Sequence, residues 1–541
     1  MWTLGINWKW HDSAAALVDE NGTVWAFAEE ERFTRRKHAW NTFPAQATRF
    51  CLATAGITWE DVHTVAVGWD FPHLRHDADQ VLSTIFETNV EGHRRPELVF
   101  VQHHLAHGLS AFYSSGFERA GILIIDGSGE IDSATIYSAD RISGLTSKRS
   151  WSRRYSLGSM YMAATPLLGF GKLDSGKTMG LAPYGIGRSG SAYPIGDLAN
   201  GRMDAESPAA RLSDESTFNE FTDVWKAYLA NRVGTPTAPS GDLHTDPVAV
   251  SLAASAQRTV EETFRVLHAE AVSLSGSNTV CLAGGVALNC VANGLLPEPL
   301  HIPPFPHDAG VALGAAWSVC PPRTCEPAIS PYLGANVEMG SELQDLRDAG
   351  YRVCEVSASA VARLVVDGRV GAVVEGRAEV GPRALGHRSI IALPRPACVR
   401  DELNAIKNRE AWRPFAPVTL SSYSTRLWPN QGNREQYMIG TSVTSSLART
   451  VMAAAVHVDG TTRPQVIPPS NGVVGEMLEK LSAGGVAPVL VNTSFNNRGE
   501  PIVNSARDAL HCFVNLGLDF LVLGDQLVER RRPTGVTRET S

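Results

Sequence analysis

Residues 3–28 read TLGINWKWHDSAAALVDENGTVWAFA, three short apolar runs separated by two polar breaks. The breaks fall at 7–13 and at 19–22, and the pair Asn21-Gly22 in the second break favours a tight hairpin turn. Each run is about as long as an ordinary strand. The pattern predicts a three-strand meander whose first turn carries polar side chains.

Similar apolar runs recur along the chain and end in polar or glycine residues, at 64–68, 121–127, 279–283, 371–375 and 488–492. Such runs are typical of buried strands in mixed α/β sheets. Between them, Asp246 and Pro247 have the residue types preferred at a helix start, and Gly276 has the type preferred just beyond a helix end. The sequence therefore predicts an α/β protein.

The chain of 541 residues is too long for a single hydrophobic core. We expect one domain over 1–345 and a second over 355–541, because a Pro-rich, loop-like segment separates the two sets of strands. Between 186 and 245 the apolar pattern gives way to Gly, Ser, Pro and Asp. We interpret this stretch as an insertion or a long surface loop.

The composition argues against nucleic-acid-binding, membrane and secreted proteins. Lys and Arg number 48 and Asp and Glu 56, a formal charge of −8, whereas nucleic acids and anionic membranes attract positive surfaces. The start of the chain lacks the features of a secretory signal, and no apolar run reaches the about 18 residues of a membrane span. Eight cysteines without a CxxC pair indicate a reducing compartment. We expect a cytoplasmic protein that binds neither nucleic acid nor membrane; its oligomeric state stays open.

A candidate metal site begins with His103 and His107, which lie four residues apart and share a face if the segment is helical. Asp126 ends an apolar run, and Asp308 precedes another helical segment. Two imidazoles and two carboxylates suit iron, manganese or zinc. A purely structural histidine pair is the alternative.

Glycine-rich turns mark candidate anion sites, since glycine lets the backbone approach a phosphate closely. Three occur in the first half: Gly127-Ser128-Gly129, Ser175-Gly176-Lys177, and Gly284-Gly285 with Asn289 following. Each alone is a weak signal because the chain holds 48 glycines.

Arginines in the second half lie in Gly- and Pro-containing turns beside apolar segments. They occur in GPRALGHRS at 381–389, KNREAWRPF at 407–415, TRP at 462–464 and NTSFNNRGEP at 492–501. Arginine in such places binds phosphate or carboxylate through two parallel hydrogen bonds. Ordinary surface salt bridges are the alternative. Four clusters in one module favour an oxyanion site.

Together these motifs resemble the O-carbamoyltransferases of antibiotic and nodulation-factor biosynthesis, the NodU/CmcH group. The resemblance runs through both halves and rests on HDSAAAL at 11–17, EEERFTRRKH at 29–38, VQHHLAH at 101–107, DGSGE at 126–130, GGVALN at 284–289, GPRALGHRS at 381–389, WRPFAP at 412–417 and NTSFNNRGEPIV at 492–503. It implies an actin-like ATPase domain, similar to threonylcarbamoyl-transfer proteins, followed by a YrdC-like α/β domain.

The resemblance also implies roles for individual residues. The implied metal ligands, typically for iron(II), are His103, His107, Asp126 and Asp308. The implied nucleotide-binding residues are Gly127, Ser128, Gly129, Lys177, Gly284, Gly285 and Asn289. The implied carbamoyl phosphate pocket consists of Lys407, Arg413, Arg463, Asn492 and Arg498, with Arg383 and Arg388 nearby. His11 and Lys37 are implied where the acceptor hydroxyl meets the carbamoyl group.

The implied reaction has two stages and uses carbamoyl phosphate and ATP, the ATP with Mg²⁺. Carbamoyl phosphate loses phosphate in the second domain, and the resulting carbamate attacks ATP to give carbamoyladenylate and pyrophosphate. In the first domain a hydroxyl of a small-molecule acceptor, by family habit an antibiotic sugar or a macrolide, attacks the carbamoyl carbon. His11 is the candidate base, since imidazole titrates near neutrality.

Three other functions stay open at this point. An actin-fold small-molecule kinase would explain the glycine turns but not the arginine clusters. A tRNA threonylcarbamoyl-type transferase is disfavoured by the charge of −8. A nucleotide-bound regulator would bind ATP without turning over carbamoyl phosphate.

Overall fold

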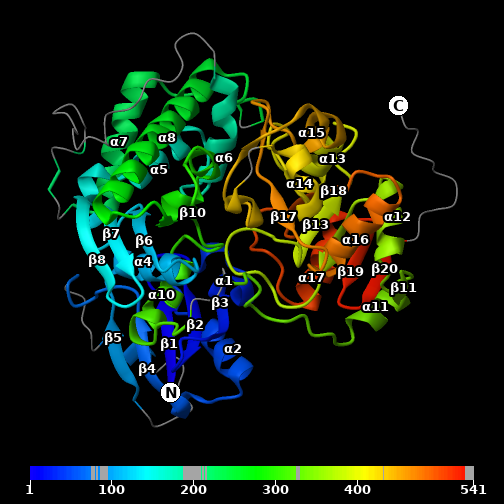
Figure 1. The fold of residues 1–541 in the computed structure, drawn as a ribbon. Coiled ribbons are helices and arrows are strands. Elements are labelled where there is room, and N and C mark those ends of the chain that lie inside the picture. Colours follow the sequence, from blue (N-terminus) through cyan, green and yellow to red (C-terminus); the bar gives the residue numbers. More distant parts are fainter. Residues whose placement is uncertain are drawn as a thin grey trace.

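The computed structural model describes residues 1–74, 80, 83–85, 95–186, 209, 212–213, 216–239, 241–324, 329–429 and 432–530. Figure 1 shows two parts side by side, with the N-terminal half in blue to green and the C-terminal half in yellow to red. Among the described helices, none has both the length and the apolar character needed to cross a bilayer.

The first sheet contains the expected meander. Its strands are β1 (Trp2–Asn7), β2 (Ala14–Asp19), β3 (Val24–Glu29), β4 (Val62–Val67) and β5 (Glu97–Phe100). They lie in the order β3-β2-β1-β4-β5, in which β1, β2 and β3 are antiparallel neighbours and β4 and β5 are added in parallel.

A second sheet repeats this plan. Its strands are β6 (Arg119–Ile125), β7 (Asp132–Asp140), β8 (Gly144–Ser152), β9 (Val280–Ala283) and β10 (Leu300–His301). The order is β8-β7-β6-β9-β10, with antiparallel pairing from β6 to β8 and parallel pairing from β6 to β10. This duplicated strand order is the one expected for an actin-like fold, so the predicted fold of the first half is confirmed.

Helices α4 (His103–Tyr113) and α10 (Ala309–Val319) pack closely against each other, with α4 also against the second sheet and α10 against the first. A Cβ atom on Gly314 would lie 1.8 Å from the carbonyl oxygen of Ala106, so glycine is required for this approach. Ala309 to Trp317 are all buried, as in a helix that is apolar on every side. The ends of these two helices carry His103 and Asp308.

The other helices of the first half include the helix predicted from Asp246, and it is confirmed. They are α1 (Glu30–Thr34), α2 (Ala45–Ala55), α5 (Leu157–Leu167), α6 (Ser175–Leu181), α7 (Phe218–Val233), α8 (Pro247–Ser275) and α9 (Cys290–Gly294). The Asp246 carboxylate accepts hydrogen bonds from Val248 N and Ala249 N, and Gly276 ends α8 with φ of 67°.

The reading of 186–245 as a long loop is wrong for 218–233, where α7 forms. Phe221, Trp225 and Leu229 are spaced by four residues and are all buried in the core of the second sheet, so this helix has an apolar stripe that the abundant polar residues concealed. Residues 187–208 of the proposed insertion lie outside the described part of the chain.

The C-terminal half is built on one mixed sheet, ordered β11-β20-β19-β12-β13-β18-β14-β17 among the described residues. The strands are β11 (Arg352–Glu355), β12 (Gly371–Val374), β13 (Arg388–Ala392), β14 (Ala416–Leu420), β17 (Gln465–Ile467), β18 (Val489–Ser494), β19 (Phe520–Leu523) and β20 (Gln526–Glu529), and β15 (Ser442–Val443) pairs separately with β16 (Thr461–Thr462). The α/β class is confirmed here as well.

Helices pack against this sheet and form two apolar cores, and the same strands contribute residues to both cores. They are α11 (Glu342–Asp348), α12 (Ala358–Val366), α13 (Val399–Ile406), α14 (Ser421–Leu427), α15 (Ser446–Val451), α16 (Gly472–Ala483) and α17 (Ala506–Leu516). The boundary between 345 and 355 stays a prediction.

Candidate active site

Four side chains predicted as metal ligands, His103, His107, Asp126 and Asp308, converge in the first half. Each offers one ligand atom, all these atoms lie within 4.8 Å of one another, and all four residues are buried. Nε2 of His103 lies 3.1 Å from Asp126 Oδ2 and 3.6 Å from Asp308 Oδ1. Nε2 of His107 lies 3.5 Å and 3.6 Å from the same two oxygens. We call this group the His/Asp cluster.

Neighbouring groups fix the orientation of His103. Its Nδ1 lies 3.2 Å from the Gly68 carbonyl oxygen, which places the ring proton on Nδ1 and leaves the Nε2 lone pair facing the cluster. The Trp69 ring stacks on the imidazole with centroids 3.7 Å apart. At the start of α4 the Glu130 carboxylate accepts a hydrogen bond from His103 N at 3.0 Å. The ring is therefore held for a role at Nε2.

His104 points away from the cluster, as helix geometry predicts for the next residue along. Its Nδ1 is hydrogen-bonded to Thr135 Oγ1 at 2.8 Å. Burial lowers the pKa of His104 to about 3, so this ring is neutral.

Two of the predicted glycine turns meet at Asp126. Its Oδ1 accepts hydrogen bonds from Gly127 N at 2.7 Å and Gly285 N at 2.9 Å, which leaves Oδ2 for the histidines. A Cβ atom on Gly284, whose φ is 96°, would lie 2.3 Å from the Ile125 carbonyl oxygen. The turns thus position a ligating carboxylate, in addition to any contact with nucleotide.

The donor chemistry of the His/Asp cluster fits a divalent cation. The two Nε2 atoms lie 3.2 Å apart, so two lone pairs would repel unless a proton or a metal ion lies between them. Burial opposes a charge on His103, but Asp308 and Asp126 outweigh it and raise its pKa to about 10. The buried carboxylates therefore stabilise positive charge at this point.

The other predicted nucleotide residues are not all together. The Ser128 hydroxyl and Gly129 lie in the turn after Asp126, where the hydroxyl donates to the Gly129 carbonyl. Asn289 instead caps α9 and exchanges two hydrogen bonds with Gln257, so its side chain is already engaged. Lys177 lies 2.9 Å from Asp174 and 3.9 Å from Glu410, a residue of the C-terminal half.

His11 lies beside the His/Asp cluster and is linked to Asp12 and His38. Its Nδ1 is 3.0 Å from Asp12 Oδ2 and 3.7 Å from Asp308 Oδ2, and Asp12 Oδ1 is 2.8 Å from His38 Nδ1. Burial opposes a charge on His11, yet Asp308 and Asp12 raise its pKa to about 9. The carboxylates orient the ring through Nδ1, which leaves Nε2 for another partner.

In the C-terminal half, five cationic side chains cluster, and we call them the cation cluster: Arg383, Lys407, Arg409, Arg413 and Arg463. Burial, with Arg409 adding to it, lowers the pKa of Lys407 to about 7. Burial and Arg463 lower the pKa of Arg383 to about 9. Cations that repel one another and are largely shielded from solvent need an anion nearby.

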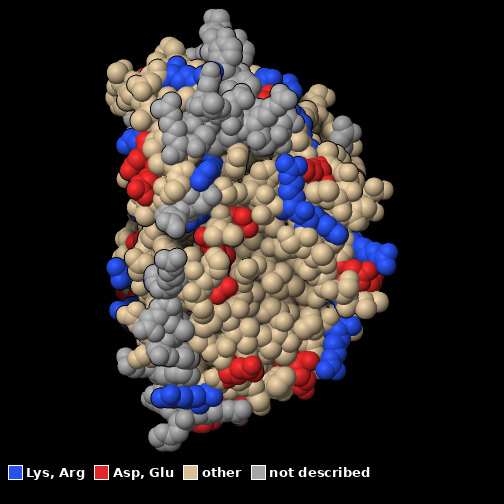
Figure 2. Space-filling view, turned by 90° about the vertical axis from the view of Figure 1, so that its left-hand side faces the viewer, with Lys and Arg blue, Asp and Glu red and all other residues tan. Residues whose placement is uncertain are grey.

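Within the described residues, the nearest carboxylate to Arg413 is Glu410, at 3.6 Å. Buried Nε atoms of Arg383 and Arg463 have no hydrogen-bond partner, nor has Asn492 Oδ1. Figure 2 shows the side of the molecule formed by the N-terminal half, where Lys and Arg side chains lie mostly around the rim, intermixed with acidic ones. In the C-terminal half, the buried Nε donors of Arg383 and Arg463 suit an oxyanion.

Three other predicted pocket residues differ in placement. Arg498 is more exposed and lies 4.0 Å from Glu410. Asn492 Nδ2 donates to Gln465 and to the Ala384 carbonyl. Arg388 is fully buried and donates to four backbone carbonyls, those of Ala335, Glu375, Gly376 and His387. Its guanidinium holds a loop, and the structure does not bring it together with the cation cluster.

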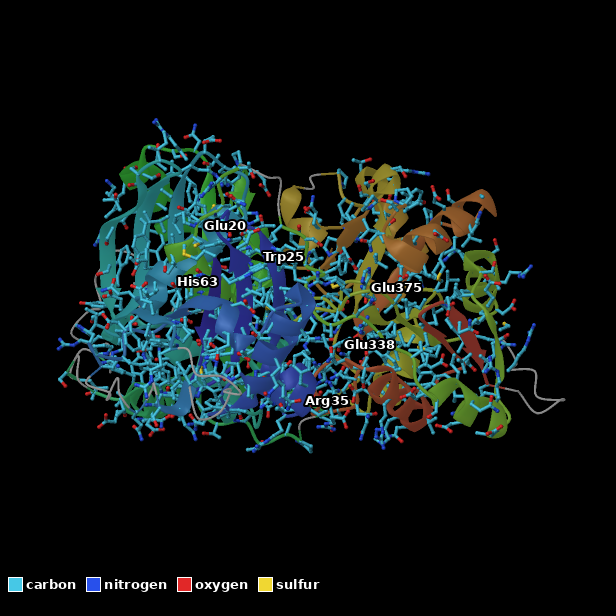
Figure 3. The ribbon with its side chains drawn as sticks, turned by 90° about the horizontal axis from the view of Figure 1, so that it is seen from below. Glu20, Trp25, Arg35, His63, Glu338 and Glu375 are labelled. Carbon is cyan, nitrogen blue, oxygen red and sulfur yellow. The ribbon has the colours of Figure 1, made fainter. Side chains whose placement is uncertain are left out.

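The two halves contact each other along α1 and the residues after it. Arg35 donates to the carbonyl oxygens of Ile502 and Pro501 at 2.7 and 2.8 Å, and Figure 3 shows it where the two halves meet. Arg32 donates to the Gly381 carbonyl, while Glu29 accepts from Gly381 N. Lys37 follows this segment, and its charge contributes to lowering the pKa of Lys407 across the boundary.

Sequence reasoning missed several residues of this site. Arg409 and Glu410 lie in the quoted motif KNREAWRPF, so their position beside Lys407 and Arg413 was a usable signal. Asp12 adjoins His11 in the motif HDSAAAL, which was a further signal. For Trp69 the sequence offered no signal, since nothing in it shows that this ring stacks on His103.

Comparison with family models matches both halves. Residues 2–73 and 79–317 match the model described as carbamoyltransferase N-terminus, and residues 362–530 match carbamoyltransferase C-terminus.

Similar proteins include nodulation protein NolNO of Sinorhizobium fredii, 34% identical over 96% of this chain and 79% of the relative. Nodulation protein NolO of Bradyrhizobium diazoefficiens is 36% identical over 81% of this chain and 80% of its own length. Among solved structures, HypF of T. kodakarensis is 13% identical with a TM-score of 0.31, covering 59% of this chain and 47% of that one.

The two family models together span most of the chain and both halves of the site. With relatives above 30% identity over most of their length, they show that this enzyme belongs to the carbamoyltransferase family.

Proposed function

We propose that this carbamoyltransferase uses ATP and carbamoyl phosphate to form carbamoyladenylate, and then transfers the carbamoyl group to a hydroxyl of a small natural product, an antibiotic sugar or a macrolide. The observation that carries the proposal is that one molecule holds both the largely buried cation cluster and the His/Asp cluster. The first suits phosphate-bearing substrates, and the second suits a cation beside a reacting hydroxyl.

In the first stage the cation cluster binds anions. Arg413 and Arg463 offer guanidinium donors to the phosphate of carbamoyl phosphate, and Lys407 adds an ammonium group whose pKa burial lowers to about 7. One water molecule cleaves the P–O bond of carbamoyl phosphate, giving phosphate and carbamate. Carbamate is unstable in water, so the shielding of this site from solvent serves to exclude further water. An oxygen of carbamate then attacks the α-phosphate of ATP, and pyrophosphate leaves.

In the second stage His11 accepts the proton of the acceptor hydroxyl. The hydroxyl oxygen forms a bond to the carbamoyl carbon, and the bond from that carbon to the AMP oxygen breaks. Asp12 holds the imidazole through Nδ1, so Nε2 is the atom that takes the proton.

The residues that would hold iron(II), manganese or zinc are His103, His107, Asp126 and Asp308. When bound there, a divalent cation balances the carboxylate charges that raise the pKa of His11 and acts as a Lewis acid toward phosphate and carbonyl oxygens.

The test is release of pyrophosphate from ATP, with and without carbamoyl phosphate, followed by analysis of the adenine nucleotide after an acceptor is added. We expect carbamoyl phosphate-dependent pyrophosphate release and AMP as the final nucleotide. ADP as the product would favour a kinase instead, and ATP binding without turnover of carbamoyl phosphate would favour a regulator.

A further inference from the structure

One turn lies between the two halves of the site. It consists of the 3₁₀ helix η1 (Lys37–Ala39) and Trp40, and we call it the 37–40 turn. At one end, the positive charge of Lys37 contributes to lowering the pKa of Lys407 in the cation cluster and the pKa of Asp174. At the other, the Trp40 ring lies edge-on to the His11 ring, with centroids 5.3 Å apart and planes at 70°.

The 37–40 turn is held firmly in an unusual backbone conformation. His38, Ala39 and Asn41 have φ values of 64°, 40° and 47°, in the left-handed region that is strained for residues other than glycine. The surrounding contacts compensate: Asp12 N donates to the His38 carbonyl at 2.7 Å, and Asn41 N donates to the Trp10 carbonyl at 2.8 Å. The place of Trp40 is therefore fixed by the backbone on both sides.

Trp40 is nevertheless 47% exposed. Another exposed tryptophan, Trp25 on β3, is 41% exposed but has structural partners, because its Nε1 donates to Asp19 and its ring packs on Trp2. Figure 3 shows Trp25 among the strands of the first half. A partly exposed aromatic ring, held in place beside the His11 imidazole, presents an apolar face suited to a ligand.

We propose that Trp40 forms one wall of the acceptor subsite, and that the acceptor is a ring-shaped polyol, such as a saccharide or cyclitol, whose C–H face stacks on the indole. A ring hydroxyl then points toward His11 Nε2, while the carbamoyl group arrives from the Lys37 side. This inference rests on the proposed function and names the acceptor class of the same site. Trp40 acts by binding the acceptor and takes no part in forming carbamoyladenylate.

The test compares Trp40→Ala and Trp40→Phe with the native protein, using Trp25→Ala as the matched control. The acceptors are methyl glycosides and an aminocyclitol on one side and open-chain polyols of equal carbon number on the other. Carbamoyl phosphate-dependent pyrophosphate release is measured first, and transfer of labelled carbamoyl groups second. Thermal unfolding reports whether each variant is folded.

We expect cyclic acceptors to be carbamoylated in preference to open-chain ones. Trp40→Ala should raise the KM for the cyclic acceptor about tenfold or more with a smaller change in kcat, because the contact with the aromatic ring is lost. Trp40→Phe should recover most of this loss, and Trp25→Ala should leave the KM unchanged.

Unchanged acceptor KM in folded Trp40→Ala, or equal use of open-chain polyols, would overturn the inference while leaving the proposed function intact. Absence of pyrophosphate release in the native protein would instead overturn the proposed function. Loss of pyrophosphate release in Trp40→Ala would contradict the assignment of Trp40 to the acceptor alone.

Discussion

Two buried carboxylates face the imidazoles of His103 and His107, whereas the cation cluster brings five cations together, with Glu410 as the carboxylate beside Arg413. The first region stabilises positive charge and raises the pKa of His103 to about 10; the second disfavours it and lowers the pKa of Lys407 to about 7. In each region the protein leaves a charge imbalance that a ligand of opposite sign corrects. The first region carries excess negative charge and is therefore suited to a cation. The second carries excess positive charge and is therefore suited to phosphate-bearing anions.

The largest expected effect is at the His/Asp cluster. His103→Ala or His107→Ala removes one ligand of four, so we expect bound metal to fall well below one equivalent and carbamoyl transfer to fall by about 10³-fold or more. Elemental analysis of the purified variants measures the metal. His104→Ala is the control, since His104 is hydrogen-bonded to Thr135, and it should keep its metal. Equal metal loss in all three variants would contradict the assignment.

At the cation cluster, Arg413→Ala removes a charge and its donors. We expect carbamoyl phosphate-dependent pyrophosphate release to fall about 10²- to 10³-fold, the usual result of losing one charged contact to a reacting phosphate. Arg352→Ala is the control, because Arg352 is 67% exposed and pairs only on the surface with Glu529. Similar activity in both variants would show that the cluster does not bind the substrate anion.

The contact between the halves is the subject of a smaller prediction. Arg35→Ala leaves the carbonyl oxygens of Ile502 and Pro501 without their donors and removes the ion pair with Asp508. We expect a loss of about 2 kcal/mol of stability, seen as a Tm lower by several degrees. Arg36→Ala, at the exposed neighbouring position, should leave the Tm within about one degree. A Tm of Arg35→Ala equal to that of the native protein would show that these contacts do not stabilise the contact between the halves.

The smallest effect concerns Glu375, a carboxyl group of the C-terminal half labelled in Figure 3. Burial raises its pKa from 4.5 to about 7, so the folded protein favours the protonated form. Its contribution to stability is present in full below pH 4.5 and is lost as the pH rises through 7. Glu375→Gln should therefore flatten the decline in stability over this range, by about 1–2 kcal/mol once partial exposure is allowed for. Parallel pH profiles of the two proteins would contradict the shift.

Local patterns were enough to predict much of the first half. The breaks around Asn21-Gly22, the helix start at Asp246 and the spacing of His103 and His107 each depend on neighbours in sequence, and all three predictions are confirmed as structure. Helix α7 was missed because its apolar stripe of Phe221, Trp225 and Leu229 lies among many polar residues. An apolar stripe on one face of a helix is easily hidden among polar residues in this way.

Long-range contacts could not be predicted. Motif position placed Arg388 with the phosphate-binding arginines, but its guanidinium donates to backbone carbonyls that only the folded chain brings within reach. Asn289 is likewise engaged by Gln257 from a distant helix. The position of Trp40 beside His11 depends on a left-handed turn that residue types alone do not specify.

The most direct test compares two variants, Arg413→Ala and His11→Ala, after thermal unfolding has shown that both are folded. Synthetic carbamoyladenylate is supplied to each variant. If the cation cluster serves formation of the adenylate and His11 serves transfer, Arg413→Ala should carbamoylate an acceptor from supplied carbamoyladenylate at near the native rate. His11→Ala should retain pyrophosphate release from ATP and carbamoyl phosphate but fail in transfer. If Arg413→Ala fails equally with the supplied intermediate, the division of labour is contradicted, and both stages share a single site.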